Sequence, residues 1–364
     1  MAGIKENFFL MGNQILARAA FDAGAKMMFG YPITPATEIL ETWIELCEDK
    51  ELKTENLKPK YLQTEDEMAA GFATIGACLA GVPAFTATSG PGNVLMQDAF
   101  SMAEALRIPT VAMIMQRGGL STSTVIYSQE EVRLTCFGGN GEGFRIVYST
   151  SNLQELYDYT LKAFQSAWQY RFPTFILADG YQGKMKGEVE INLKLKTPRP
   201  RQAKRGGQNL KLIEPILKSG VNLRNCYNLE EEIGEIISQY SDEYQQVREE
   251  IEEFEEYQLE GAKTIIIAHG IVAAAVKPAV DQLRKNGQAV GLFRPITLRP
   301  FPSMGAKKVL EKAEKIITIE SALGQLSELF KSEFYWINDP LVEINKPAVG
   351  FTPEEIYGTI TQLS

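Results

Sequence analysis

Cysteine and histidine are scarce in this chain. Four cysteines occur among 364 residues, at positions 47, 78, 136 and 226, and no two of them form a C-x-x-C pair. This spacing argues against a zinc site, a redox dithiol or an iron–sulfur cluster held by this chain alone. A single histidine, His269, argues against a His-rich metal site and a Ser-His-Asp triad. Catalysis would therefore depend on carboxylates or on a cofactor.

Basic residues and long apolar runs are also in short supply. Lys and Arg number 37 against 46 Asp and Glu, a net charge of −9, which argues against sequence-independent binding to nucleic acid or to an anionic membrane. The longest apolar run, Thr264 to Val276, is interrupted by His269 and is shorter than the ~20 residues that span a bilayer. The amino terminus lacks a basic leader before an apolar run. We therefore expect a cytoplasmic protein.

The composition is that of a globular protein, with 45% hydrophobic and 23% charged residues. Since 364 residues exceed twice the length of a typical domain of about 150, two units are expected. Buried strands are predicted at Met27–Gly30, Ala84–Thr88, Thr110–Met115, Arg145–Tyr148 and Thr174–Ala178. Helices are predicted at Gly12–Ala23, Pro35–Cys47, Glu65–Ala80, Met96–Leu106 and Leu153–Tyr170. This alternation predicts an α/β fold with a parallel sheet whose ligands bind at the carboxyl ends of the strands.

The chain is predicted to have three parts. The first domain covers residues 1–183, and a second α/β domain covers 261–364, with strands at 263–268, 289–293 and 315–319 and a helix at 272–286. Residues 184–260 form a linker that is first basic and then strongly acidic, with thirteen acidic residues and one basic residue in 230–260. Tyr240, Tyr244, Val247, Ile251 and Phe254 are spaced as one stripe of a single helix over 230–260. Its charged face is either solvated or a docking surface for a partner.

The loop after the first predicted strand contains Thr34 between two prolines, Pro32 and Pro35. Thr34 could be the N-cap of a helix that begins at Pro35, which would account for its hydroxyl group. A rigid loop at the carboxyl end of a strand could equally present that hydroxyl group and free helix amides to an anionic ligand.

Three acidic residues, Glu65, Asp66 and Glu67, open a helix of small residues. Acidic residues interact favourably with the dipole at a helix start, but three exceed what a cap requires. Glu67 begins the surface of small residues that permits close packing, so we expect it to be enclosed. An enclosed acid has a raised pKa and can donate a proton to a bound heterocycle.

Two further loops follow predicted strands. Ser89-Gly90-Pro91-Gly92-Asn93 joins a strand to a helix, and its glycines permit close approach to a ligand, although a tight turn alone could explain them. Arg117 ends the next strand, at the same edge as Thr34. It could pair with an acid or bind a carboxylate through two hydrogen bonds.

Two other glycine-rich segments are not interpreted as cofactor sites. Gly139 to Gly143 lacks the G-x-G-x-x-G spacing and follows no clear strand. Ala178-Asp179-Gly180, with Asn209 thirty residues later, only partly matches the pattern that holds Mg²⁺ and a diphosphate, because its first glycine is missing.

The four loops together resemble the α subunit of the 2-oxoacid:ferredoxin oxidoreductases. The matching segments, in order, are Tyr31-Pro32-Ile33-Thr34-Pro35, Glu65-Asp66-Glu67, Thr88-Ser89-Gly90-Pro91-Gly92 and Gln116-Arg117-Gly118-Gly119. Leu298 to Pro302 is similar to part of the family's second domain, and the resemblance is weakest over 184–260. It implies a thiamine diphosphate pyrimidine-binding domain followed by a transketolase C-terminal-like domain.

The resemblance also implies roles for individual residues. Glu67 would hydrogen-bond the pyrimidine ring nitrogen and favour the imino tautomer, which removes the thiazolium C2 proton. Thr34 and Arg117 would bind the 2-oxo-carboxylate of the substrate. The other residues expected at the cofactor are Tyr31, Pro32, Ser89, Gly90, Pro91 and Asn93. No metal ligand is expected in this chain.

The implied reaction is the oxidative decarboxylation of a 2-oxoacid to acyl-CoA and CO₂ with reduction of ferredoxin. A β subunit would supply the diphosphate and Mg²⁺ site, and partner subunits would supply [4Fe-4S] clusters. Gln116-Arg117 with Ser121-Thr122 favours 2-oxoglutarate, whereas 178–180 with 183–185 is closer to 2-oxoisovalerate enzymes; 2-oxoglutarate is slightly favoured and pyruvate is a third alternative. Leu120, Ser123 and Asn140 depart from residues that are common in the family.

Two other interpretations stay open at this point. The chain could be a non-catalytic α/β subunit that binds a nucleotide or a partner through the same loops. It could also belong to another thiamine-dependent class, such as a decarboxylase or a synthase.

Overall fold

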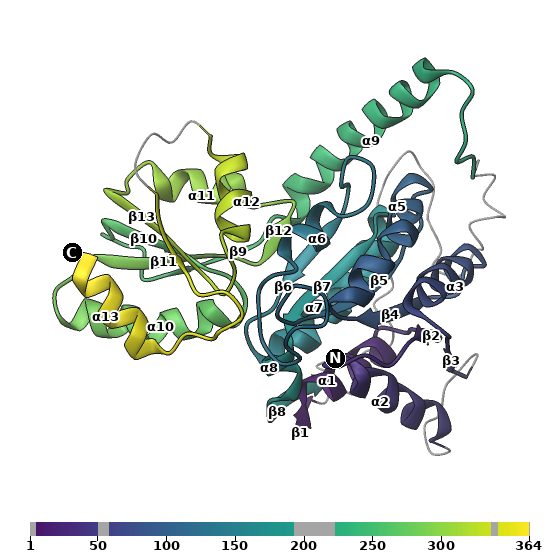
Figure 1. Ribbon diagram of the computed structural model, residues 1–364, viewed down its shortest axis with the longest axis horizontal. Helices are drawn as coiled ribbons and strands as arrows, with labels where there is room; N and C mark the ends of the chain where they lie inside the picture. The colour runs from purple at the N-terminus through teal and green to yellow at the C-terminus, as the bar shows by residue number, and fades with distance from the viewer. Residues whose placement is uncertain (1–4, 50–57, 193–222, 336–340, 364) are drawn as a thin grey trace.

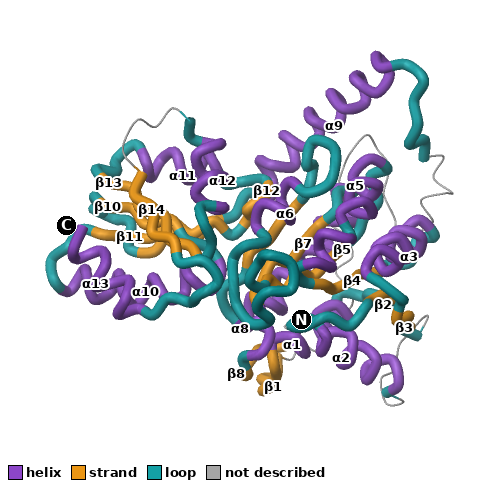
Figure 2. The backbone as a smooth tube through the Cα atoms, viewed as in Figure 1, coloured by secondary structure: helices purple, strands orange, loops and turns teal. Residues whose placement is uncertain are grey.

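The computed structural model describes residues 5–49, 58–192, 223–335 and 341–363. Two α/β units lie side by side, each built on a largely parallel sheet (Figures 1 and 2). The predicted fold class is therefore confirmed.

The first unit contains a seven-stranded sheet. Its strands, from one edge to the other, are β12 (Thr297–Arg299), β6 (Ile146–Ser149), β7 (Thr174–Asp179), β5 (Val111–Gln116), β4 (Ala84–Thr88), β2 (Met27–Gly30) and β3 (Lys60–Gln63). Neighbouring strands are parallel except β12, which pairs antiparallel with β6. The parallel strands place all their following loops at one edge of the sheet.

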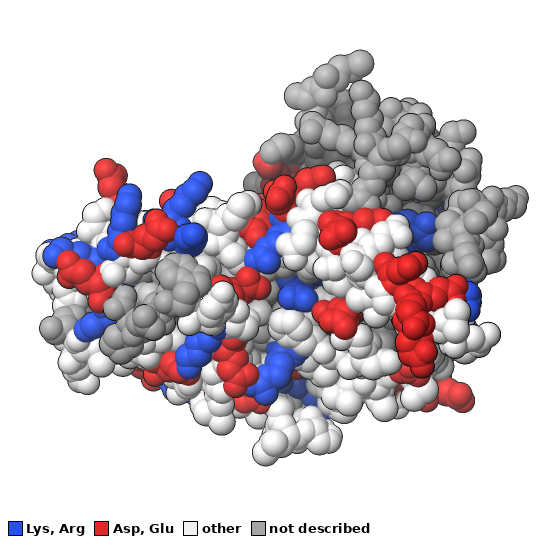
Figure 3. Space-filling model, turned by 90° about the horizontal axis from the view of Figure 1, so that it is seen from above, with Lys and Arg blue, Asp and Glu red and all other residues white. Residues whose placement is uncertain are grey.

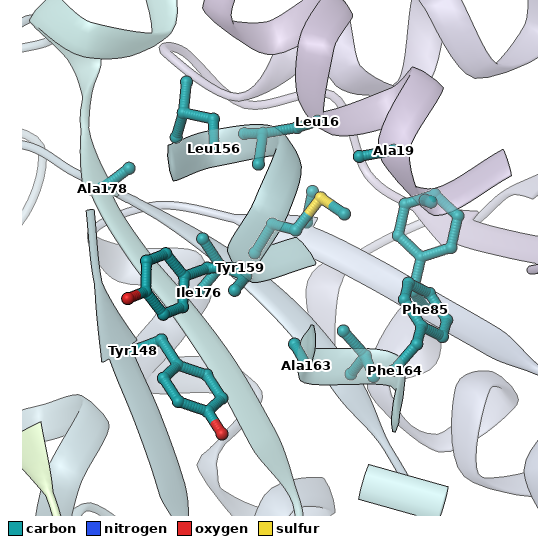
Figure 4. Close-up of a cluster of buried hydrophobic side chains, with 14 of the residues drawn as sticks. Leu16, Ala19, Phe85, Tyr148, Leu156, Tyr159, Ala163, Phe164, Ile176 and Ala178 are labelled. Atoms are coloured by element: carbon teal, nitrogen blue, oxygen red, sulfur yellow. The ribbon is translucent and has the colours of Figure 1, made fainter. Parts of the chain in front are cut away.

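Helices cover both faces of this sheet. They are α1 (Gly12–Asp22), α2 (Thr37–Glu48) and α7 (Leu153–Tyr170) on one face, and α3 (Glu67–Leu79), α5 (Gln97–Ala105) and α6 (Val132–Phe137) on the other. Two short helices, α4 (Pro91–Leu95) and α8 (Gly180–Lys184), follow β4 and β7. Successive side chains of a strand point to opposite faces of the sheet and so pack in different cores. Met113 packs against α1, α2 and α7, in the core of which Figure 4 shows a part, whereas Ile114 packs in the core on the face covered by α3, α5 and α6. A strand buried on both faces requires the continuous apolar runs from which it was predicted.

A two-stranded antiparallel sheet lies beside the first unit. It pairs β1 (Lys5–Met11) with β8 (Lys186–Asn192). Residues beyond the boundary expected at 183 thus pair with the first strand of the chain. The boundary itself stays a prediction, and the interior of the basic linker, 193–222, lies outside the described residues.

The second unit contains a five-stranded sheet. Its order is β14 (Leu341–Asn345), β13 (Lys315–Glu320), β10 (Thr264–Ile267), β11 (Val290–Pro295) and β9 (Phe254–Tyr257), with β9 antiparallel. Helices α10 (Gly270–Lys285) and α13 (Pro353–Leu363) cover one face, and α11 (Ser303–Leu310) and α12 (Gln325–Glu333) cover the other.

Helix α9 (Glu230–Ile251) lies along the first unit (Figure 1). The predicted stripe is confirmed within it, since Tyr244, Val247 and Ile251 are buried, and the Tyr244 hydroxyl group donates to the Arg145 carbonyl oxygen at 2.5 Å. The expectation that the helix continues to residue 260 is wrong: it ends at Ile251, and Phe254 begins strand β9. The pairing of β9 with β11 replaces the helix there.

Buried polar contacts join the two units. Arg294 of β11 forms an ion pair with Glu155 of α7 and donates to the Ser149 carbonyl oxygen. His269 is buried, with Nδ1 2.9 Å from the Ser149 hydroxyl oxygen. Burial and the nearby Arg294 charge lower the pKa of His269 to about 3, so the ring is neutral at pH 7.

No helix within the described ranges is both long enough and apolar enough to cross a bilayer. Figure 3 shows that the face seen from above carries groups of acidic side chains together with scattered basic ones, as the net charge of −9 leads one to expect.

Candidate active site

Four loops meet at the carboxyl edge of the first sheet. They follow β5, β4, β2 and β3, which are consecutive neighbours in the sheet. These loops carry Arg117, the turn from Ser89 to Gly92, the loop around Thr34, and Glu67. The parallel register therefore gathers the four predicted motifs at one edge.

Glu67 is enclosed, whereas the two acidic residues before it are exposed. The Asp66 carboxylate is the N-cap of α3 and accepts from the Ala69 amide at 2.7 Å. Glu67 is the first residue of α3 and only 5% exposed, and among the described residues its carboxyl group has no hydrogen-bond partner. The cap thus accounts for one acid and leaves Glu67 available for another role.

The Gly90–Gly92 turn lies directly against Glu67 and Arg117. Gly90 has φ 51° and ψ −119°, a conformation that essentially only glycine adopts. A Cβ atom at Gly90 would lie 2.6 Å from Nε of Arg117, and one at Gly92 would lie 2.7 Å from Oε1 of Glu67. Both glycines are therefore required by close approach to the two charged side chains.

Arg117 is a buried cation that forms no ion pair within the described ranges. It is 4% exposed, its Nη1 donates to the Thr34 carbonyl oxygen at 2.7 Å, and its Nε atom has no partner among the described residues. No carboxylate of the described ranges lies within 4.0 Å of its guanidinium nitrogens. Because an unpaired buried charge is costly, the guanidinium group is suited to an anionic ligand.

Thr34 is exposed beside this cation. The interpretation that it caps a helix beginning at Pro35 is wrong, since α2 begins at Thr37 and its N-cap is Ala36. The Thr34 hydroxyl group is consequently not needed for capping. Tyr31, on the same loop, is 38% exposed, and Pro32 is half-buried.

Asn93 has its side-chain amide engaged within the chain. Its Nδ2 donates to Glu131 Oε2 at 2.9 Å and Thr135 Oγ1 at 3.2 Å, and its Oδ1 accepts from Gln97 at 2.8 Å. These bonds fix the start of α4. Direct contact of Asn93 with a cofactor stays a prediction.

Glu131, which was not predicted from the sequence, is buried beside these loops. Its carboxylate accepts from the Gly90 amide at 2.9 Å and from the Arg117 amide at 3.2 Å. Burial raises the pKa of Glu131, and these hydrogen bonds, the one from Asn93 and the nearby charge of Arg117 oppose that rise. The only local signal is a pair of acidic residues, Glu130-Glu131, in a segment without other motif character.

Asp179 has a structural role in the chain. Its carboxylate caps α8 and accepts from the Gln182 amide at 2.8 Å, and burial raises its pKa to about 7. The possible second member of that motif, Asn209, lies outside the described residues.

Two of the positions that depart from residues common in the family lie in loops. Leu120 is 96% exposed with φ 56°, and the backbone amide of Asn140 donates to the Ser101 hydroxyl oxygen.

Comparisons with known proteins agree with this architecture. Residues 18–256 match the family described as pyruvate flavodoxin/ferredoxin oxidoreductase, thiamine diP-binding, and residues 262–350 match pyruvate:ferredoxin oxidoreductase core domain II. The fold and site thus define a thiamine diphosphate-binding α/β protein. The chain belongs to the 2-oxoacid:ferredoxin oxidoreductase family of enzymes, among the α subunits.

Similar proteins in this family are named for different 2-oxoacids. The chain is 34% identical over 336 residues to the 2-oxoglutarate synthase subunit KorA of Methanocaldococcus jannaschii, covering 87% of this chain and 89% of that one. It is 32% identical over 321 residues to the ketoisovalerate oxidoreductase subunit VorB of Methanothermobacter marburgensis, covering 88% of each. A solved 2-oxoglutarate:ferredoxin oxidoreductase from Magnetococcus marinus has the same fold, with a TM-score of 0.83 and 24% identity over 98% of this chain and 65% of that chain.

The site contains groups that fit the pyrimidine half of thiamine diphosphate. Two buried hydroxyl oxygens, Oγ1 of Thr88 and Oγ of Ser89, have no partner within the described ranges. They lie at the end of β4 and the start of the turn that carries Gly90 and Gly92, and Thr88 Oγ1 and the Glu67 carboxyl group both lie within 3 Å of the place of a Cβ atom at Gly92. Unpaired buried polar atoms beside a glycine turn are characteristic of a site that a polar ligand completes.

Proposed function

We propose that this chain forms the pyrimidine-binding side of a thiamine diphosphate site in an enzyme that converts a 2-oxoacid and coenzyme A into acyl-CoA and CO₂ while reducing ferredoxin. The observation that carries this proposal is the enclosure of an acid and a guanidinium group, Glu67 and Arg117, against the same Gly90–Gly92 turn, with no ion-pair partner for either among the described residues.

Glu67 is the proposed catalytic acid. Thiamine diphosphate, when bound, supplies a carbon nucleophile and an electron sink for decarboxylation. The Glu67 carboxyl group would hold a proton at the pyrimidine ring nitrogen. The residues proposed to surround the pyrimidine with it are Tyr31, Pro32, Ser89, Gly90, Pro91 and Asn93.

Arg117 and Thr34 are proposed to bind the substrate. The unpaired guanidinium group would neutralise the carboxylate of the 2-oxoacid, to which it can donate two parallel hydrogen bonds. The hydrogen bond from Nη1 to the Thr34 carbonyl oxygen joins this threonine to the guanidinium group, which supports its assignment to the same ligand. Its exposed hydroxyl group would donate to the substrate.

Partner subunits are proposed to complete the enzyme. Large apolar side chains are exposed on the site loops and the helices that begin there, namely Tyr31, Met68, Val94, Leu95 and Leu120. Such exposure is typical of a surface that another chain covers. We propose a β subunit with the diphosphate and Mg²⁺ site, small subunits with [4Fe-4S] clusters, and ferredoxin as the acceptor. The cytoplasm stays the predicted location.

The favoured substrate is 2-oxoglutarate. The support comes from Gln116-Arg117 with Ser121-Thr122 and from the name of the relative at 34% identity. Because a relative at 32% identity is named for ketoisovalerate and one at 29% for pyruvate, these two acids belong in the same test.

The test uses the native complex, purified with its partner subunits. Viologen reduction is measured with 2-oxoglutarate, 2-oxoisovalerate and pyruvate, each with coenzyme A. We expect 2-oxoglutarate to give the highest kcat/KM. Glu67→Gln should lower kcat by about 100-fold or more, because general acid–base catalysis contributes factors of this size.

Glu65→Gln is the matched control. It makes the same change two residues earlier, on an exposed side chain. We expect this variant to keep the wild-type rate. A wild-type rate in Glu67→Gln would refute the assignment of Glu67, and a complex that reduces viologen with none of the three acids would refute the proposed reaction.

A further inference from the structure

Glu131 connects the two halves of the candidate site. It lies just before α6 and is contributed by neither the cofactor turn nor the substrate arginine. One carboxylate oxygen accepts from the Gly90 amide at 2.9 Å and the Arg117 amide at 3.2 Å, and the other accepts from Asn93 at 2.9 Å. Three segments are thus tied to one buried side chain.

The position of the Arg117 guanidinium group depends on these bonds. The Arg117 side chain lies on Gly90, with Nε 2.6 Å from the place of a Cβ atom there. Glu131 holds the amide of Gly90 and the amide of Arg117 itself. It therefore fixes both the support beneath the guanidinium group and the point from which its side chain extends.

The same carboxylate lies close enough to Arg117 for the two charges to interact, but it forms no ion pair with the guanidinium group in the described part of the chain. Oε1 is occupied by two backbone amides and Oε2 by Asn93. The Arg117 Nε atom is thereby left without a partner in the described residues and is available to a ligand.

We propose that Glu131 is a positioning residue that sets the Arg117 guanidinium group for the carboxylate of the 2-oxoacid and aligns it with the Gly90–Gly92 turn. This inference rests on the proposed function, which it deepens by naming the residue that couples substrate binding to the cofactor turn.

The test compares Glu131→Gln with the wild-type complex. The amide retains one oxygen acceptor but turns an N–H group towards the Asn93 amide, which is also a donor. We expect KM for the 2-oxoacid to rise by about 10-fold or more, the size associated with a hydrogen bond to a charged group, with a smaller change in kcat. Hydrogen exchange at the Gly90 and Arg117 amides should be faster, a readout that does not depend on activity.

Asp22→Asn is the control for the loss of a partly buried, hydrogen-bonded carboxylate. Asp22 accepts from Arg18 and from Tyr157, and it ends α1, just before β2 starts, at the sheet edge opposite the site. This variant should lower the melting temperature of the complex without changing KM. A rise in KM in both variants would indicate a general loss of stability and would overturn the positioning role.

A double-variant cycle separates this inference from the proposed function. If Glu131 acts through Arg117, then Glu131→Gln should raise KM much less in an Arg117→Lys background than in the wild-type background. If Glu131→Gln raises KM equally in both backgrounds, the positioning role of Glu131 is wrong. It is also wrong if Glu131→Gln leaves KM unchanged while Glu67→Gln is inactive, and in both cases the proposed function still stands. The absence of 2-oxoacid activity in the wild-type complex would instead refute the proposed function.

Discussion

A methyl group at position 92 would enter space that Glu67 and Thr88 occupy. The Cβ atom of Gly92→Ala would lie 2.2 Å from Oγ1 of Thr88 and 2.7 Å from both Cγ and Oε1 of Glu67. Ordinary contact begins at 3.4 Å, so the Glu67 carboxyl group must move by about 0.7 Å, the difference between 3.4 and 2.7 Å. The substitution therefore displaces the proposed catalytic acid without altering its chemistry.

Two effects of different size follow from this displacement. Overpacking a well-filled site costs about 1–3 kcal/mol of stability, which a chain with two large cores tolerates. Misplacing a reacting group by about 1 Å can cost 100-fold in rate, so a shift of this size should lower kcat/KM by about 10-fold to 100-fold. Gly92→Ala should consequently fold and assemble, yet lose most of its activity.

The measurement compares the Gly92→Ala complex with a Gly76→Ala complex. Gly76 lies on the same helix as Glu67, and no atom lies within 4 Å of the place of a Cβ atom there. Gly76→Ala should raise stability by up to about 1 kcal/mol, because alanine favours a helix, and leave kcat/KM unchanged. A Gly92→Ala complex with wild-type kcat/KM and wild-type affinity for thiamine diphosphate would refute the placement of Glu67 against this turn.

Three further outcomes are expected. Gly90→Ala should raise KM for the 2-oxoacid by about 10-fold or more, since its Cβ atom would displace Arg117, and steady-state kinetics measures the change. Below pH 6.5 His269 gains a proton in the unfolded chain, whereas in the folded chain it stays neutral down to about pH 3, so its contribution should lower the free energy of unfolding by about 1.4 kcal/mol for each pH unit that the pH is lowered. Denaturation at several pH values should show a weaker pH dependence for His269→Gln, and equal slopes would contradict this. Tyr244→Phe removes the hydrogen bond to the Arg145 carbonyl oxygen, costs about 1 kcal/mol, and should speed hydrogen exchange in α9.

Elements buried on both faces were predicted well from the sequence. The bounds of β2, β4 and α7 agree with the predictions because their apolar runs have clear ends. Strand β3, whose four side chains are exposed, and the three-residue β12 carry no such pattern and were missed. Their place is determined by pairing with strands distant in sequence, which local periodicity does not encode. Helix α4 was missed because Gly-Pro-Gly resembles a simple turn.

The residues of the candidate site likewise include some that were predicted from local sequence and one that was not. Thr34, Gly90 and Arg117 were found because each follows a predicted strand of the parallel sheet, and Glu67 was found because three acidic residues open a helix of small residues. Glu131 was missed because it comes from an irregular segment and meets Gly90 across 41 positions of sequence. Its neighbour Glu130 is chemically identical but binds the Gly119 amide, so residue type alone could not distinguish the two.

The arrangement also shows how an acid and a guanidinium group stay apart in a small site. Whether two such buried groups gain by pairing depends on their geometry, because the cost of removing both from water can exceed their attraction. Here Arg117 is held back by the Thr34 carbonyl oxygen and by the bond from its amide to Glu131, while Glu67 extends from the rigid start of α3. The Gly90–Gly92 turn lies between them and is itself fixed through Gly90. These contacts hold the two groups on either side of the turn, and no ion pair joins them in the described residues, as the proposed roles with a proton-accepting ring and a carboxylate require.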